Sequence, residues 1–276
     1  MQPLAKIKPF LKWPGNKFRC IEQITSQLPK GLRLIEPFAG SGAVFLNSQF
    51  TSYILGERNA HLIHLYLLLQ EEGENFIDYC SHWFQPQFNQ ATYFYQLREQ
   101  FNLSQDKRLK AALFLYLNRH GFNGLCRFNL KGFFNVPFGA YKKSYFPFQE
   151  MMRFHQKAKD CFFICQDFED TFKLAKPGDV IYCDLPYHPI SKTANFTAYT
   201  AGYFNHQSQI QLAKLAEISA KQGIHVLISN HDTPFTRELY KECQHIHSFE
   251  VSRSISCKSD KRNKVKEILA YYTANL

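Results

Sequence analysis

The stretch LIEPFAGSG at residues 34–42 decides the fold, because an apolar run leads through Glu36 into a turn that contains Gly40 and Gly42. Glycine has no Cβ, so the backbone at such a turn can approach a ligand closely. The pattern predicts a strand, a tight turn and a helix. Glycine turns also occur where a helix only packs against a strand, and the third glycine of a GxGxxG pattern is absent. A nucleoside ligand without a pyrophosphate therefore fits better than a dinucleotide.

Two further apolar runs end in acids. The run over 53–57 ends in Glu57, 17 residues after Gly40. In mononucleotide-binding folds an acid at an offset of about 20 residues accepts the hydroxyls of a ribose. The run VIYCDLPY at 180–187 ends in Asp184, which is expected at the carboxyl end of a strand, where open α/β sheets bind ligands. Taken alone, this tetrapeptide is also typical of an Asp-initiated turn stiffened by proline.

The DLPY segment suits the alkylation of an exocyclic aromatic amine. The amino nitrogen of adenine is a poor nucleophile because its lone pair is delocalised into the ring. The Asp184 carboxylate and the Leu185 carbonyl can hold its two hydrogens, and Pro186 restricts Leu185 to an extended backbone. Tyr187 supplies a ring on which the base can stack. A base inside a duplex is out of reach, so it must be flipped out.

Strands and helices alternate on both sides of a helical block at 61–119. A helix that begins after the N-cap Asn205 and stops at Gly223 precedes a further strand at 224–229. Near the C-terminus, two alternating segments predict an antiparallel pair of strands. These segments are 247–253 and 265–272.

This order of elements predicts a doubly wound, mostly parallel α/β domain that is interrupted by a helical module. The α/β domain is expected over 1–69 and 149–276, and the helical module over 70–148.

The chain of 276 residues carries 33 Lys and Arg against 23 Asp and Glu, a formal charge of +10. Between 107 and 149 there is no acid, while basic residues alternate with aromatic residues and glycines. Cations pair with phosphates and aromatic rings stack on bases, so this segment indicates a surface that binds a polyanion. The alternative is a packed core with a few exposed lysines.

Several classes of protein are disfavoured by composition. No apolar run reaches the roughly 18 residues that span a bilayer, and the N-terminus has no signal-peptide core. The eight cysteines form no CxxC pair, so neither a zinc site nor a redox motif is indicated. Scattered cysteines are more typical of reduced thiols in a cytosolic protein than of a disulfide framework.

Taken in order, the motifs resemble those of the Dam-type DNA adenine-N6 methyltransferases (D12 class), the family that methylates adenine in GATC. The resemblance covers nearly the whole chain. Its segments are FLKWPGNK at 10–17, EPFAGSG at 36–42, YLNRHGFNGLCR at 116–127, NVPFG at 135–139, DLPY at 184–187, ANFTAY at 194–199 and ISNHD at 228–232. It implies a Rossmann-like fold that uses S-adenosylmethionine and carries an inserted target-recognition domain.

Carried over by position, the resemblance implies three groups of site residues. The catalytic group consists of Asp184, Leu185, Pro186 and Tyr187. The cofactor-binding group consists of Trp13, Lys17, Phe38, Gly40, Gly42, Glu57, Asp167, Phe168 and Asp184. The DNA-binding group consists of Lys12, Arg119, Phe122, Asn123, Leu125, Arg127, Pro137, Tyr141 and Lys142.

The resemblance also implies a role for most of the cofactor-binding residues. Trp13 and Lys17 would help to hold the cofactor or the DNA near it, and Glu57 would bind the ribose. The methionine half is expected at Phe38 and Gly40, and the adenine at the two residues Asp167 and Phe168.

On the DNA side, Arg127 would read a guanine through a bidentate contact, and Lys12 is a candidate contact to the outer guanine. The space left by the flipped adenine would be entered by Phe122 and Asn123. The thymine methyl would be touched by Leu125 and Pro137.

At four positions the sequence departs from the family pattern. Leu185 replaces the first proline of DPPY, and Glu57 replaces the usual aspartate, which is one methylene shorter. Phe122 replaces a common tyrosine and lacks its hydroxyl. Ala140 stands where an arginine is frequent, which would weaken contact with DNA outside the target site.

The expected function is methyl transfer from S-adenosylmethionine to N6 of a flipped-out adenine in duplex GATC, by in-line displacement without a metal. The protein is expected to be a monomer, cytoplasmic and associated with the nucleoid, with no membrane partner. Two other readings remain open, a DNA-binding protein that has lost catalysis and a methyltransferase of RNA. A nicotinamide-dependent oxidoreductase is disfavoured by the missing third glycine and the basic insert.

Overall fold

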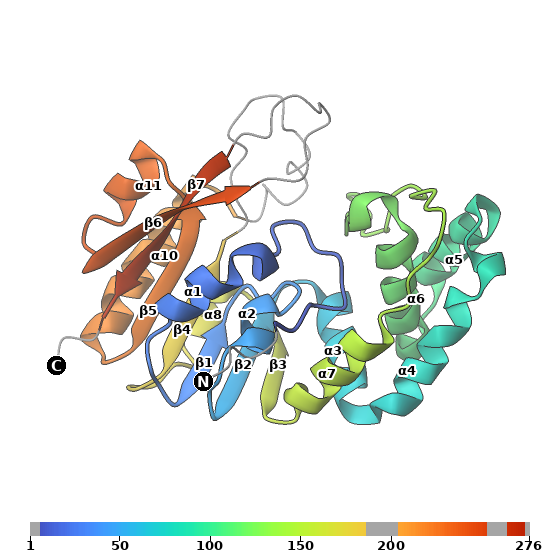
Figure 1. Cartoon of the computed structure of the whole chain (residues 1–276), viewed down its shortest axis with the longest axis horizontal. Coiled ribbons are helices and arrows are strands. Elements are labelled where there is room, and N and C mark those ends of the chain that lie inside the picture. The colour runs from blue at the N-terminus through green and yellow to red at the C-terminus, as the bar shows by residue number, and fades with distance from the viewer. Residues whose placement is uncertain (1–5, 186–203, 253–263, 274–276) are drawn as a thin grey trace. The chain divides into compact units, whose positions relative to one another are not determined.

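The computed structural model describes residues 6–185, 204–252 and 264–273 (Figure 1). Within them, seven strands form one sheet in the order β3-β2-β1-β4-β5-β7-β6. The strands are β1 Arg33–Glu36, β2 Ser52–Glu57, β3 Cys161–Cys165, β4 Val180–Asp184, β5 His225–His231, β6 His245–Ser252 and β7 Lys264–Tyr272. β1 pairs in parallel with β2 and β4, and β4 with β5. β7 is antiparallel to both β5 and β6.

The strand order reverses at β1, because β2 lies on one side of it and β4 on the other. Ligands of open α/β sheets bind outside the carboxyl ends of the strands at such a reversal. The sheet is therefore the mostly parallel, doubly wound, Rossmann-like sheet that the sequence predicts, with an antiparallel pair at its C-terminal end. The ends of β1 and β4 are the first place to look for a site.

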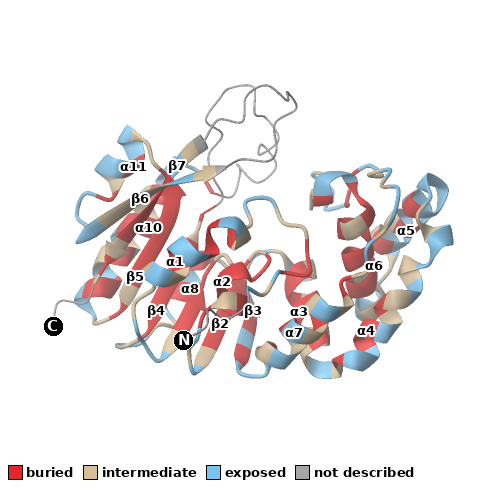
Figure 2. Cartoon of the chain, in the orientation of Figure 1, coloured by how far each residue is buried: buried red, intermediate tan, exposed pale blue. Residues whose placement is uncertain are grey.

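The central strands are buried on both faces, as Figure 2 shows for β4 and β5. The side chains from Val180 to Cys183 are at most 1% exposed. Strands covered on both faces read as continuous apolar runs, which is why the predicted strands in this region are confirmed. The short edge strand β3 was not predicted, and its Phe162 is 57% exposed.

The chain forms two compact units. The first comprises Met1–Phe18, Gly40–Asn47 and Glu57–Cys165, and the second comprises Arg19–Ala39, Ser48–Gly56 and Gln166–Leu276. The module predicted at 70–148 lies within the first unit.

The first unit is mainly helical. Its helices are α2 Ala43–Asn47, α3 Ala60–Glu72, α4 Glu74–Ser81, α5 Ala91–Leu103, α6 Lys107–His120 and α7 Phe148–Ala158, with short 3-10 turns η2 His82–Phe84, η3 Pro86–Phe88 and η4 Phe122–Gly124. Asp106 caps α6 by accepting from two backbone N–H groups of its first turn. α6 packs against α3, α4 and α5, and its residues 111–118 are buried. A helix buried on all sides forms the core of this unit.

The second unit contains α1 Ile21–Gln27, α8 Phe168–Phe172, α10 His206–Lys221 and α11 Pro234–Leu239. A further 3-10 turn, η1 Lys17–Cys20, precedes α1. Asn205 caps α10 through a capping box with Ser208, and Gly223 adopts φ +82° just after the helix, so both predicted ends are confirmed. α10 packs against β5 and β7. No helix in the described residues is both long and apolar enough to cross a membrane.

Candidate active site

Asp184 lies at the carboxyl end of β4, in register with Ser229 of β5. It is partly exposed, whereas the four residues before it are buried, so its carboxylate is at the rim of the sheet and not in the core. Leu185, the next residue, is only 3% exposed. The other two predicted catalytic residues, Pro186 and Tyr187, lie outside the described residues.

The strands β1 and β4 each carry a carboxyl group at their carboxyl ends. β1 ends at the buried Glu36, one residue beyond the pair formed by Ile35 and Ile181. The pKa of the Cys183 thiol is raised well above its usual value, first by burial and then by the charges of Asp184 and Glu36. Acceptors therefore dominate this end of the sheet, which suits a ligand that brings hydrogen-bond donors or positive charge.

Three phenylalanines gather beside these strand ends. Phe38 stacks on Phe168 with ring centroids 5.5 Å apart, and Phe204 meets both rings edge-on at 5.4 and 5.7 Å. Asp167 caps α8 by accepting from the N–H of Glu169 at 3.3 Å. The predicted adenine-binding pair thus combines an apolar ring with an acceptor at the start of a helix.

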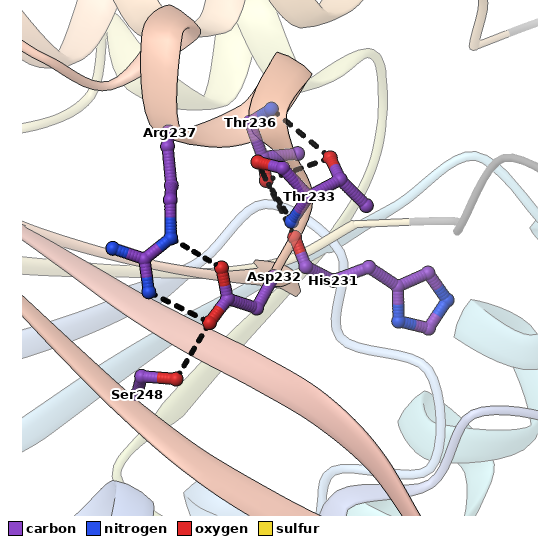
Figure 3. A network of polar contacts seen from close by, with 6 residues as sticks. All are labelled: His231, Asp232, Thr233, Thr236, Arg237 and Ser248. Atoms are coloured by element: carbon purple, nitrogen blue, oxygen red, sulfur yellow. Dashed lines mark hydrogen bonds and ion pairs between the residues drawn. The ribbon is translucent and has the colours of Figure 1, made fainter.

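Polar contacts hold the segment at the end of β5 and the start of α11, residues 231–237 (Figure 3). The Asp232 carboxylate accepts two hydrogen bonds from Arg237, at 2.6 and 2.8 Å, and one from Ser248 at 2.6 Å. The Arg237 hydrogen bond is the main reason that the pKa of Asp232 is lowered. Thr236 donates to the carbonyl of His231 at 2.6 Å. These contacts give the segment a structural role, and nothing in them requires a chemical role for His231.

In the first unit, the glycine turn is held from three sides. Gly40 adopts φ +47°, and its N–H donates to Glu57 Oε2 at 3.3 Å. Its carbonyl accepts from the Tyr66 hydroxyl at 2.5 Å. A Cβ at Gly40 would lie 2.9 Å from Nε1 of Trp13, so the indole covers this glycine. Gly42 adopts φ +68°, which also favours glycine.

Glu57 ends β2 and keeps capacity for a ligand. Its Oε1 accepts from the Asn59 N–H at 3.1 Å, and its Oε2 accepts from Gly40. The Arg58 backbone is a third hydrogen-bond partner of this carboxylate. A carboxylate has about four lone-pair sites, so capacity for a further donor is left. Burial raises the pKa of this carboxyl, and the backbone N–H groups oppose the rise. The remaining predicted cofactor residue of this unit, Lys17, is buried at the start of η1.

The loop after α6 presents the predicted recognition residues. Phe122 and Asn123 are exposed, and Asn123 adopts φ +53°, which turns the chain sharply. Pro137 is exposed as well, and Leu125 is half-buried. Arg127 donates to the side-chain oxygen of Asn135 and to its carbonyl.

Beside that loop, the Lys12 side chain lies between a backbone carbonyl and an aromatic ring. Its Nζ donates to the carbonyl of Arg119 at 3.0 Å and sits 3.7 Å from the centroid of the Tyr141 ring. Burial, with the positive charge of Arg119, lowers the pKa of Lys12 to about 8. Arg119 in turn donates to the carbonyl of Tyr145, and Lys142 is exposed. The structure therefore brings the nine predicted DNA-binding residues together in one unit.

Residues 13–255 match the sequence model of a family described as "D12 class N6 adenine-specific DNA methyltransferase". The chain belongs to this family. It is 48% identical over 269 residues to the "DNA adenine methylase" of Escherichia coli (strain K12), which covers 98% of this chain and 96% of that relative. It is 47% identical over 274 residues to the "DNA adenine methylase" of Vibrio cholerae serotype O1 (strain ATCC 39315 / El Tor Inaba N16961), which covers 99% of each.

Among solved structures, a putative RNA methyltransferase from Pyrococcus horikoshii matches with a TM-score of 0.40 and 8% identity, over 100% of this chain and 93% of that one. The family assignment therefore rests on sequence. As a D12-class enzyme, the protein is an adenine-N6 DNA methyltransferase.

Two residues of this D12-class enzyme that matter to the site escaped the sequence analysis. Asn135 braces Arg127, and Asn118 contacts both Lys12 and Gly124. A signal for Asn118 is visible in retrospect, since it follows the apolar run LFLYL within a helix that is buried on all sides. A buried amide in such a position has backbone partners elsewhere in the chain.

Proposed function

We propose that the enzyme transfers a methyl group from S-adenosylmethionine to N6 of an adenine that is flipped out of duplex DNA, within the sequence GATC. The observation that carries the proposal is the position of Asp184, a partly exposed carboxylate at the end of a buried parallel strand where the sheet order reverses. The family supplies the reaction, adenine-N6 methylation of DNA.

The target amine is activated by two acceptors. The Asp184 carboxylate accepts a hydrogen bond from one N6 hydrogen, and the Leu185 carbonyl accepts a hydrogen bond from the other. Together these hydrogen bonds direct the nitrogen lone pair away from the conjugated ring. Leu185 is anchored because its side chain is buried, and Pro186 restricts its backbone to the extended region. During the transfer the Asp184 carboxylate stabilises the positive charge that develops on N6. After transfer, the excess N6 proton leaves to solvent or to the carboxylate.

The residues described for the cofactor fit S-adenosylmethionine, which when bound supplies an electrophilic methyl group on a sulfonium. Glu57 accepts a hydrogen bond from the ribose with the capacity that the backbone groups of Gly40, Arg58 and Asn59 leave open. Phe168, stacked on Phe38, offers an apolar face to a flat ring, and Asp167 offers an acceptor to its amino group. Trp13 closes over Gly40 and excludes water from the turn.

The recognition loop supplies the contacts to DNA. The Asn135 contacts of Arg127 occupy Nε and one hydrogen of Nη2, so the outer edge of the guanidinium is left for the two acceptors of a guanine. Phe122 and Asn123 project into solvent and enter the space that the flipped adenine leaves. The thymine methyl is contacted by Leu125 and Pro137. Lys12 meets the outer guanine.

The remaining expectations about partners are also part of the proposal. Arg119, Tyr141 and Lys142 contact the phosphate backbone, which makes binding salt-dependent. The inserted segment 70–148 acts as the target-recognition domain, and 1–69 with 149–276 as the catalytic domain. The enzyme works as a monomer and needs no metal. Because its named relatives are bacterial DNA methylases, we place it in the cytoplasm with the nucleoid.

The test uses methyl-tritiated S-adenosylmethionine and a duplex with one GATC site. A duplex with a scrambled site and a structured RNA serve as competitors. Asp184→Asn should lower the rate by at least about 100-fold, the range of one general-base or oxyanion contact, while DNA affinity stays within a few-fold. Asp78→Asn, which changes an exposed acid of α4 in the same way, is the matched control. Near wild-type methylation by the Asp184 variant, or equal methylation of the scrambled duplex, would overturn the proposal.

A further inference from the structure

The N-terminal segment 6–16 contains no helix or strand, yet side-chain amides hold it at two points. Asn47 pairs with both backbone groups of Ile7, accepting at 2.8 Å and donating at 2.9 Å. Asn118 pairs in the same way with Lys12, accepting at 2.9 Å and donating at 2.6 Å. Between these two points, the buried Phe10 packs edge-on against Phe154 with centroids 5.1 Å apart. We call this segment the strap.

Asn118 connects the strap to the recognition loop. Its side chain is fully buried, and its Nδ2 donates to the carbonyl of Gly124 at 3.0 Å as well as to that of Lys12. A carboxamide has two N–H hydrogens, and these two carbonyls are their shortest contacts, with Cys126 Sγ farther away at 3.5 Å. Gly124 adopts φ +65°, and a Cβ there would overlap the Lys12 side chain. The strap and the loop are thus in van der Waals contact as well as bridged.

The next residue of the strap reaches the glycine turn. Trp13 covers Gly40, and the N–H of Gly40 donates to Glu57. Consecutive residues, Lys12 and Trp13, therefore contact the recognition loop and the glycine turn, and all of these groups belong to one unit. A shift of the strap at one of the two residues displaces the other, since the peptide between them is planar and rigid.

We propose that Asn118 is a positioning residue that couples the binding of cofactor to the binding of DNA. Filling the glycine turn fixes Trp13, and through Lys12 and Asn118 this orders the loop that carries Asn123 and Arg127. Because coupling between two ligands is reciprocal, DNA on the loop also raises the affinity for the cofactor. The inference rests on the proposed function, since it takes the glycine turn as the cofactor site.

The experiment measures the affinity for S-adenosylhomocysteine, which has no methyl group to transfer, by calorimetry with and without a GATC duplex. The ratio of the two dissociation constants is the coupling factor. In the wild type we expect a factor of about 5 or more. In Asn118→Asp the two donors become acceptors that face the carbonyls of Lys12 and Gly124, so the factor should fall to within twofold of 1.

Asn102 offers a matched control. Its amide pairs with both backbone groups of Phe134, accepting at 2.8 Å and donating at 3.2 Å, and neither hydrogen bond involves the strap. Asn102→Asp therefore makes the same chemical change at the amide that holds Phe134. It should weaken DNA binding and leave the coupling factor at the wild-type value. If Asn118 had only a structural role, Asn118→Asp would resemble Asn102→Asp, with weaker DNA binding and an unchanged coupling factor.

Gly124→Ala disturbs the contact with Lys12 from the loop side and covers the case in which Asn118→Asp does not fold. It too should bring the coupling factor toward 1. A coupling factor of 1 in the wild-type enzyme would overturn the inference. So would a coupling factor as large as that of the wild type in Asn118→Asp or in Gly124→Ala, whichever folds. If the wild type does not bind S-adenosylhomocysteine at all, the proposed function fails instead.

Discussion

Arg127 is locked to Asn135, because its Nε donates to the side-chain oxygen of Asn135 at 2.7 Å and its Nη2 donates to the carbonyl of the same residue at 3.2 Å. Two contacts from one residue fix the plane of the guanidinium. A bidentate contact to a guanine depends on that plane, since both acceptors lie on one edge of the base.

Asn135→Ala should therefore reduce discrimination more than it reduces binding. One of the two contacts that fix the plane is lost, so we expect about 1 kcal/mol less preference for GATC over the site in which the G·C pair read by Arg127 is replaced by A·T. The measurement is kcat/KM on the matched duplexes. Asn129→Ala is the control, because Asn129 caps the neighbouring turn through the N–H groups of Lys131 and Phe133. An unchanged preference in Asn135→Ala would contradict the role given to Asn135.

The lowered pKa of Lys12 predicts a pH-dependent affinity for DNA. With a pKa of about 8, caused first by burial and then by Arg119, Lys12 loses its charge as the pH rises from 7 to 9. A neutral amine is a weaker donor to a guanine and has no attraction to phosphates, so affinity should fall about tenfold over this range. Filter binding at constant ionic strength measures the effect.

Lys12→Arg keeps the charge at every pH in this range, so its binding curve should be flat. A wild-type curve as flat as that of Lys12→Arg would show that Lys12 does not meet the DNA. The effect on stability has the opposite sign, because the unfolded chain binds the proton more tightly. The free energy of unfolding should rise as the pH increases from about 8 to 10.

Glu57→Gln should weaken cofactor binding with little effect on DNA binding. It replaces a charged acceptor of the ribose hydroxyls by a neutral one, and hydrogen bonds to charged groups contribute about 1.5–3 kcal/mol. We expect a tenfold or larger rise in KM for S-adenosylmethionine.

The pH profile adds a second check on Glu57. Burial raises the pKa of this carboxyl, so cofactor affinity should fall with decreasing pH earlier than an ordinary glutamate would allow. The profile of Glu57→Gln should lack this step. A KM that does not change in the variant would remove Glu57 from the cofactor site.

Asp232→Ala tests the structural role of the segment after β5. It removes the bidentate ion pair with Arg237 and the hydrogen bond from Ser248, and because the Arg237 side chain is 53% exposed, solvent limits the cost to about 1–2 kcal/mol. The pKa of Asp232 is lowered, so this stability is present above about pH 4 and is lost as the pH falls below it. Urea unfolding at pH 7 and at pH 3 should give a larger difference between wild type and variant at pH 7 than at pH 3. Catalysis at pH 7 should persist in the folded variant.

The sequence predicts those helices and strands whose local signals, such as caps and apolar runs, agree with their place in the tertiary structure. Asn205 and Gly223 bound α10 because a cap and a left-handed turn are local signals. The edge strand β3 was missed because its five residues CFFIC form an apolar run too short to separate a strand from a helical segment, and Phe162 is largely in solvent. Propensity carries little information about so short an edge strand.

The candidate site divides in the same way. Asp184 and Glu57 stand at the ends of strands that their own apolar residues predict, so their positions follow from the sequence. The partner of Asn118 does not, because Lys12 is 106 residues away in the chain and no local pattern links the two. Contacts of this kind become visible only when the fold brings distant segments together.

The strap places a strict limit on chain length. Phe10 is anchored in the core, and the residues two and three positions later each have a fixed neighbour, Asn118 for the first and Gly40 for the second. One amino acid inserted between Phe10 and Lys12 would put the wrong side chain at both neighbours at once. The fold tolerates substitutions in this segment where only the backbone is hydrogen-bonded, but it does not tolerate insertions or deletions.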